Sequence, residues 1–180
     1  MSKAAVIQRD SREVSAAPPD TERCGAETDA LKSDRGVSGH RFDGRRRWAA
    51  SLQLGFASRQ EGSGRVTRLS SLHHEGPLRV QRPFYPEGPG GCCHVYLLHP
   101  PGGLVSGDAL TIRAEVDEQA HALLTTPAAA KIYAADSHGV ASSQDVHLSV
   151  RRGGALEYLP QETIAFDGAR TSQSTRLDTV

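Results

Sequence analysis

The chain has 180 residues, with 21 Lys and Arg against 21 Asp and Glu, so its formal net charge at neutral pH is zero. This balance disfavours nucleic acid or an acidic membrane surface as the main partner, and no apolar run reaches the length of a membrane span. The three cysteines form no disulfide framework and the N-terminus lacks the apolar core of a signal peptide, which together favour a reducing, cytoplasmic setting.

The first segment, residues 1–46, is rich in charge, Ser, Ala and Pro and holds few large apolar side chains. Such a segment cannot offset the entropy lost on ordering, so we expect a disordered tail. The Arg45-Arg46-Arg47 cluster at its end is typical of a solvated charge run at a domain edge. Residues 47–180 are expected to form a single β-rich domain.

From Trp48 onward, apolar and polar residues alternate with the period of half-buried strands. The segment 76–91 carries four prolines and therefore cannot be a central strand throughout. Strands are expected around 48–56, 66–72, 93–97, 109–116, 120–126, 146–150, 155–159 and 164–166, followed by a last segment from Ala169. The pattern predicts a mainly β fold of antiparallel meanders.

One short helix is expected after the strand at 120–126. Thr126 has the chemistry of an N-cap, Pro127 suits the first helical position, and a run of alanines follows. At the other end, no partner strand follows the segment from Ala169. We expect either that it pairs with an earlier strand or, as we favour, that the sequence is part of something longer.

The glycine-rich stretch HPPGGLVSGD raises the possibility of a phosphate-binding loop. Gly102 and Gly107 have the spacing of a P-loop, but Asp108 and Ala109 replace the lysine and the hydroxyl residue that bind phosphate and magnesium. An alternating strand, rather than a helix, follows. The pattern favours a tight turn between two strands and no nucleotide site.

Metal ligands come next, because Cys92, Cys93, His94 and His99 lie close together in the sequence. In a strand, Cys93 and His99 are about 20 Å apart and cannot share an ion, whereas Cys92 and His94 are neighbours on one face. Two ligands do not complete a structural zinc site. The alternative is that one cysteine faces the core as a small apolar residue.

A hydrolytic site is the other chemical reading of this region. His99, Ser106 and Asp108 are near in sequence, but the nucleophile elbow G-x-S-x-G is absent. Glu157 and Glu162 form a pair of acids with the chemistry for acid–base work, although solvation at a sheet edge is the usual fate of such residues.

Four blocks in a fixed order carry a family resemblance: GPLRVQRPFYPEG, CHVYLLHPPGGLVSGD, AHALLTTPAAAKIY and LEYLPQETIAFDGAR. From about Trp48 to Arg170 the chain resembles the urease accessory protein UreD family, called UreH in some organisms. Residues 1–46 have no counterpart in it, and family members continue past Val180. The chain is therefore similar to an N-terminal portion of such a protein.

The resemblance implies a non-enzymatic scaffold of stacked, β-helix-like sheets with one or two short helices. Such proteins dock on apo-urease and recruit UreF, and through it the GTPase UreG, so that nickel reaches the urease active site. Nickel is then an ion in transit and is not tightly retained, and the nucleotide belongs to a partner. A β-rich hydrolase or a general protein-interaction module remains the alternative.

A polar passage for nickel needs hard oxygen ligands that bind weakly. We expect its acids to be Asp108, Glu157 and Glu162, with the hydroxyls of Thr125 and Thr126 as weaker ligands. Asp108 also suits a turn cap. The other positions of the resemblance are His99, Pro100, Pro101, Gly102, Gly103, Gly107, Pro127, Lys131, Tyr133, Pro160 and Gln161.

Overall fold

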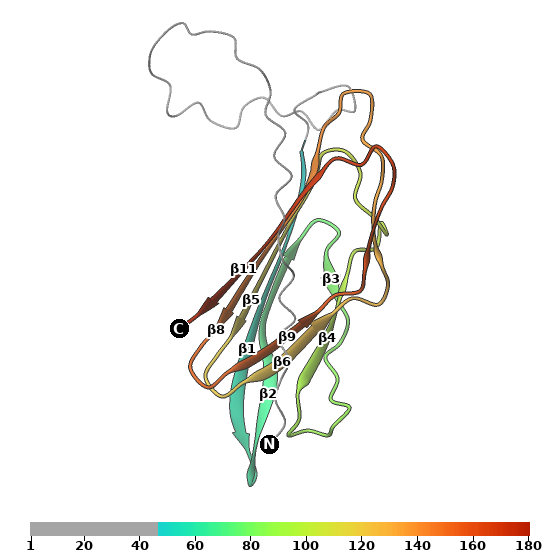
Figure 1. Cartoon of the computed structure of the whole chain (residues 1–180). Helices are drawn as coiled ribbons and strands as arrows, with labels where there is room; N and C mark the ends of the chain where they lie inside the picture. The colour runs from blue at the N-terminus through green and yellow to red at the C-terminus, as the bar shows by residue number, and fades with distance from the viewer. Residues whose placement is uncertain (1–46) are drawn as a thin grey trace, which may run out of the picture. The chain divides into compact units, whose positions relative to one another are not determined.

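The computed structural model describes residues 47–180 (Figure 1); the expected disordered tail, residues 1–46, lies outside the described residues. The described part is mainly β, as predicted, and holds no helix, so none there is long and apolar enough to cross a membrane. Its strands are β1 (Trp48–Glu61), β2 (Gly64–Glu75), β3 (Arg79–Val80), β4 (Cys93–Leu98), β5 (Asp108–Val116), β6 (His121–Thr125), β7 (Ala130–Ile132), β8 (Ser142–Val150), β9 (Ala155–Leu159), β10 (Thr163–Ala165) and β11 (Thr171–Thr179).

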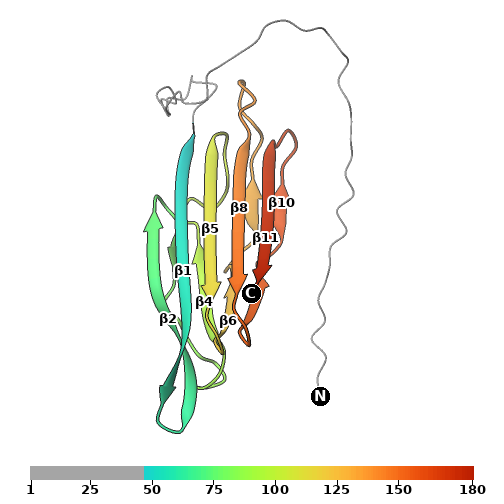
Figure 2. The same ribbon diagram turned by 90° about the vertical axis from the view of Figure 1, so that its left-hand side faces the viewer.

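The largest sheet has five strands in the order β11-β8-β5-β1-β2, which lie side by side in Figure 2. Strands β1 and β2 form an antiparallel hairpin through a turn at residues 61–64. In contrast, β1, β5, β8 and β11 pair in parallel. The expectation of antiparallel meanders is therefore correct for the first hairpin and wrong for most of this sheet.

The parallel pairing arises because the chain alternates between two sheets. After β4, β6 and β9, which belong to a four-stranded sheet of order β3-β4-β6-β9, the chain crosses to β5, β8 and β11 of the five-stranded sheet. Successive strands of one sheet are thus joined through the other sheet and run in the same direction. The turns that we expected to connect neighbouring antiparallel strands instead connect strands of different sheets. The stacked, β-helix-like arrangement implied by the resemblance is present.

The core lies between the two large sheets. It consists of every second residue along the strands, those whose side chains face inward. Leu52 and Phe56 of β1, Ile112 of β5 and Val95 and Leu124 of the opposite sheet are at most 5% exposed. Burying a side chain of this size stabilises the fold by about 1.5–3 kcal/mol. The alternation that predicted the strands therefore also identifies the core face.

The expected helix after Thr126 is absent. Residues 130–132 instead form β7, which pairs in parallel with β10 and, through Ile132, forms a bridge to Leu104. The chain passes between Leu104 and β10 here, and both hydrogen-bond to residues 130–133 in an extended conformation. Tertiary pairing therefore overrides the local helix propensity. The proline-rich segment behaves as predicted, since its only strand is the two-residue β3 at a sheet edge.

Candidate functional site

The glycine-rich stretch forms the predicted turn between β4 and β5. The amide of Gly102 donates to the carbonyl of His99 at 2.8 Å, and Gly102 has a positive φ of 80° that favours glycine. Gly107 also has a positive φ, of 86°, and its carbonyl accepts a hydrogen bond from Trp48 at 2.7 Å. These glycines shape a backbone crossing, and no helix N-terminus follows them to hold a phosphate.

This turn packs on β7 and the segment around it. Leu104 donates its amide to the carbonyl of Lys131 at 2.8 Å and accepts the amide of Tyr133 at 3.0 Å. The buried Gly103 lies against the same two residues. The ring of Tyr133 stacks on Phe166, with the ring centroids 5.3 Å apart. Three positions of the family resemblance are therefore brought together by packing.

Asp108 begins β5 and caps the preceding turn. Its Oδ2 accepts the amide of Val105 at 2.9 Å, and its own amide donates to the carbonyl of Val105 at 3.1 Å. The residue also lines an open hollow of about 290 Å³ that is shared with Arg47 and Ser143. Asp108 thus has a structural role and borders a polar depression as well.

The three residues of the hydrolytic reading do not assemble. The buried Ser106 accepts the amide of Asp136 through its hydroxyl at 2.9 Å, and no hydrogen bond within residues 47–180 joins the side chains of His99, Ser106 and Asp108. Burial lowers the pKa of His99, while the charge of Asp108 acts in the opposite direction. A nucleophile hydrogen-bonded to its base, which a triad requires, is absent from this part of the chain.

The other predicted oxygen ligands lie around the start of β10. Thr125 donates its hydroxyl to the carbonyl of Leu159 at 2.6 Å, and Thr126 accepts the amide of Gln161 at 2.9 Å. Thr126 therefore caps a loop rather than the expected helix. Glu162 is exposed, and its carbonyl accepts the amide of Ala130 at 2.9 Å. Of these three side chains, the two hydroxyls are already engaged in hydrogen bonds with the backbone.

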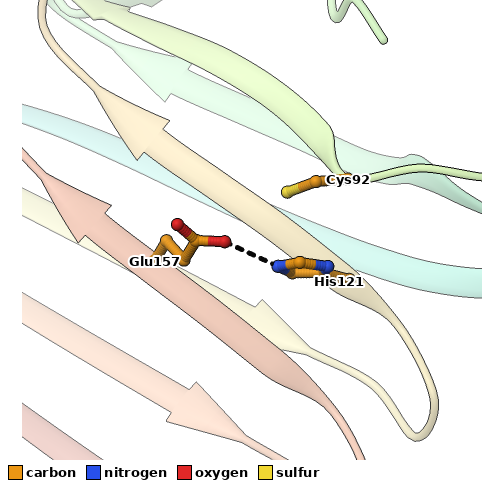
Figure 3. A group of neighbouring side chains, drawn as sticks. All are labelled: Cys92, His121 and Glu157. Carbon is orange, nitrogen blue, oxygen red and sulfur yellow. Dashed lines mark hydrogen bonds and ion pairs between the residues drawn. The ribbon is translucent and has the colours of Figure 1, made fainter. Parts of the chain in front are cut away.

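Glu157 takes part in a different group, on the outward face of the four-stranded sheet. Within residues 47–180, Cys92, His121 and Glu157 are the one set of three such side chains whose ligand atoms all lie within 4.8 Å of one another. Figure 3 shows them coming from the segment that leads into β4, from β6 and from β9. His121 Nε2 and Glu157 Oε1 are 2.8 Å apart, and both side chains are about half exposed.

The thiol of this group has an unusual electrostatic environment. Burial, and then the negative charges of Glu157 and Glu87, raise the pKa of Cys92 to about 12. The next residue, Cys93, points the other way and is fully buried in the core, as the apolar alternative for one cysteine predicted. Both cysteines are free thiols.

The pair of Cys92 and His94, which strand geometry allowed as neighbouring ligands on one face, does not form. His94 instead lies 3.3 Å from a carboxylate oxygen of Glu87, and its ring packs on Phe84. The partner that sequence reasoning missed is His121. Cys93 aligns with Ala122 of β6, so the residue before each of them falls on the same outward face. Only the strand register carries this information.

In chemical terms, the group offers a sulfur, a nitrogen and an oxygen donor to one point in space. Such a set suits a borderline divalent transition metal better than magnesium or calcium, which favour oxygen ligands alone. Three protein donors leave at least one coordination position open to solvent or to another ligand. The outward location and the half-exposed imidazole and carboxylate keep this point accessible.

A family model described as UreD urease accessory protein matches residues 49–179. The chain is similar to the urease accessory protein UreD of Marinobacter nauticus, with 67% identity over 146 residues, which cover 81% of this chain and 49% of that protein. It is 64% identical over 156 residues to UreD of Chromohalobacter salexigens, covering 83% and 49% of the two chains. It is 63% identical over 141 residues to UreD 1 of Psychrobacter cryohalolentis, covering 78% and 47%. The chain spans about half the length of these curated relatives.

Proposed function

The chain belongs to the UreD urease accessory protein family, and we propose that it serves urease maturation as a non-enzymatic scaffold that helps nickel reach the urease active site. The observation that carries this proposal is the family match over residues 49–179, together with relatives that are 63–67% identical. Within the proposal, the scaffold docks on apo-urease in the cytoplasm together with UreF, and UreG joins through UreF and supplies the GTPase activity.

The fold supports a scaffold role. Two sheets with parallel stacking present broad, regular faces, and several large apolar side chains remain exposed on the last strands. Ile164 and Phe166 are 42% and 46% exposed, and Leu177 of β11 is 60% exposed. Exposed apolar side chains are available for contacts with a partner. In the proposal, this surface contributes to assembly, not to chemistry.

In the proposal, three acids serve the metal ion in transit. Asp108 lines an open polar hollow, Glu157 lies on the outward face of the four-stranded sheet, and Glu162 is exposed at the loop before β10. Carboxylate oxygens bind nickel weakly enough for exchange when the ligand set is incomplete. The hydroxyls of Thr125 and Thr126 form hydrogen bonds with the backbone, and within the proposal they are only weak ligands for the ion.

The experiment that tests the function uses both the chain itself and a chimera. In cells that lack their own UreD, residues 49–179 replace the corresponding segment of the Marinobacter nauticus UreD, which is 67% identical to this chain over 146 residues. We expect the chimera to restore nickel-dependent urease activity. We also expect the tagged 180-residue chain or the chimera to co-purify with urease subunits and UreF, and with UreG only when UreF is present.

The unaltered relative is the positive control, and a chimera whose inserted segment carries the core substitution Leu124→Asp is the negative control. A chimera that is folded and abundant but leaves urease without nickel would contradict the proposal. Capture of UreG in the absence of UreF would contradict the proposed order of assembly.

A further inference from the structure

We propose that Cys92, His121 and Glu157 bind one divalent transition-metal ion in an open three-ligand site on the outward face of the four-stranded sheet. The site itself rests on geometry alone. Its identification as a holding point for nickel deepens the proposed function and rests on it. Neither Cys92 nor His121 belongs to the oxygen-only passage that the sequence predicts.

The donor atoms are already close to a common centre. Typical distances to a metal are about 2.3 Å for sulfur, about 2.0–2.1 Å for imidazole nitrogen and about 2.0–2.2 Å for carboxylate oxygen. Ligands of one ion are therefore separated by roughly 3–4.5 Å, and the three ligand atoms here all lie within 4.8 Å of one another. The 2.8 Å contact between His121 and Glu157 has to open slightly as the ion enters between them. Side-chain rotation is sufficient for this.

The charges around the thiol favour a cation. Glu157 and Glu87 both act on Cys92 with negative charge, and within residues 47–180 no Lys or Arg forms an ion pair with either carboxylate. A divalent ion compensates for the negative charge at this point. It binds as the sulfur–hydrogen bond of Cys92 breaks, the sulfur lone pair forms the bond to the metal and the proton leaves to solvent.

The donor set also selects the class of ion. One thiolate, one imidazole and one carboxylate favour nickel, cobalt, copper or zinc over magnesium and calcium. His121 and Glu157 are each about half exposed, at 45% and 47% of the side chain. With three protein ligands and an open side, the ion can gain a further ligand from a partner and leave. A closed structural cage would prevent this.

The test measures metal binding directly, without urease. The full 180-residue chain carries Cys24→Ser as a background change, so that the only thiols are those at positions 92 and 93. Cobalt(II) chloride and nickel(II) sulfate are titrated by calorimetry and absorption spectroscopy, with magnesium chloride as the negative ion. We expect one equivalent of cobalt to bind with a thiolate-to-metal charge-transfer band, nickel to displace it, and magnesium to leave the spectrum unchanged.

The variants Cys92→Ser, His121→Gln and Glu157→Gln remove one donor each. Changing a residue that only hydrogen-bonds to a metal ligand weakens metal affinity by about 10–100-fold. Removing a ligand itself should therefore lower the affinity by about 100-fold or more. Cys92→Ser should also show no charge-transfer band. The matched controls His147→Gln and Glu115→Gln change the same residue types on β8 and β5, which belong to the five-stranded sheet. They should bind within about twofold of the parent chain.

A measurement on the unsubstituted ligand set guards against variants that do not fold. Thermal unfolding of the parent chain should shift to a higher Tm with nickel(II) sulfate and not with magnesium chloride, because an ion that binds only the folded state stabilises it. Absence of the charge-transfer band, or unaltered nickel affinity in folded Cys92→Ser and His121→Gln, would overturn the site. A third outcome separates the site from the function: the parent chain binds metal, and a Cys92→Ser chimera still activates urease. The site and the accessory function would then both stand, but the site would not lie on the route by which nickel is delivered.

Discussion

Gly103 offers a sharp test of how the turn between β4 and β5 is packed. A Cβ added at this position would lie 2.5 Å from Cε2 of Tyr133 and 2.9 Å from the carbonyl oxygen of Lys131. Real Cβ atoms do not approach backbone oxygens this closely, so the turn or β7 has to move. That carbonyl also accepts the amide of Leu104 at 2.8 Å, and displacing it weakens the hydrogen bond. Overpacking of this kind costs about 1–3 kcal/mol.

The assay is thermal unfolding of Gly103→Ala followed by circular dichroism. For a domain of this size, about 1 kcal/mol lowers Tm by roughly 2–4 °C, so a fall of several degrees is expected. Gly64→Ala is the matched control, because a Cβ there meets nothing within 4 Å and the backbone is not left-handed. In a Tyr133→Ala background, Gly103→Ala should lower Tm by less, because the ring is absent while the carbonyl of Lys131 remains. Identical melting of Gly103→Ala and Gly64→Ala would refute the packing argument.

Four further changes probe the turn, the core and the exposed edge. Asp108→Ala should lower the unfolding free energy by about 0.5–1.5 kcal/mol in urea denaturation through loss of the cap on Val105, whereas Asp108→Asn retains an acceptor oxygen and should unfold near the parent; equal losses would exclude the cap. Burial holds the pKa of His99 below its usual 6.5, so the unfolded state takes up a proton first and stability falls as pH drops below 6.5. His99→Gln should flatten this part of the Tm–pH profile, and an unchanged profile would contradict the effect of burial on His99. Leu124→Ala, at a fully buried position, should cost about 2–5 kcal/mol in the same denaturation assay, and a loss under about 1 kcal/mol would argue against the core described. Leu177→Lys on the exposed edge strand β11 should raise the concentration at which the chain self-associates in size-exclusion chromatography, and no change would show that this edge does not drive association.

The strands were predictable from the sequence because half-buried strands leave a period of two. Residues such as Leu52 and Ile112 indicate both a strand and the face that it buries, because one side of each sheet packs on the core. The direction of pairing has no such signature. Whether the strand after Leu98 returns beside β4 or crosses to another sheet depends on contacts between segments that are distant in the chain, and the sequence alone favoured the simpler antiparallel meander.

The helix expected after Thr126 failed for a related reason. Thr-Pro followed by alanines has a real local preference for a helix start. In the fold, however, Leu104 on one side and β10 on the other offer hydrogen bonds to residues 130–133 in an extended conformation. The oxygen that was expected to cap a helix accepts the amide of Gln161 instead. Local chemistry identified Thr126 as a capping residue, and tertiary pairing decided what it caps.

The same reasoning explains why only part of the metal-ligand group could be found in advance. Periodicity placed Cys92 and Cys93 on opposite faces without deciding which of them is buried, and Glu157 was named as an expected oxygen ligand. His121 was not singled out, because its partners Cys92 and Glu157 are distant from it in the sequence. Its proximity to Cys92 follows from the alignment of Cys93 with Ala122, and its contact with Glu157 is a diagonal one, since Ala155 lies directly opposite.

This group therefore depends on the pairing of three neighbouring strands: β6 and β9 each carry one donor, and Cys92 directly precedes β4. The turn before β6 fixes the register, because Ala120 donates its amide to Asp117 at 3.2 Å and accepts the amide of Ala155 at 2.8 Å. A shift of one residue here would turn His121 toward the core and present Ala122 in its place. The buried side chains oppose such a shift at every inward position, at a cost far larger than three polar contacts on the outer face can offset. The core thus determines where the donors meet, and the ligand geometry is a consequence of apolar packing on the opposite side of the same strands.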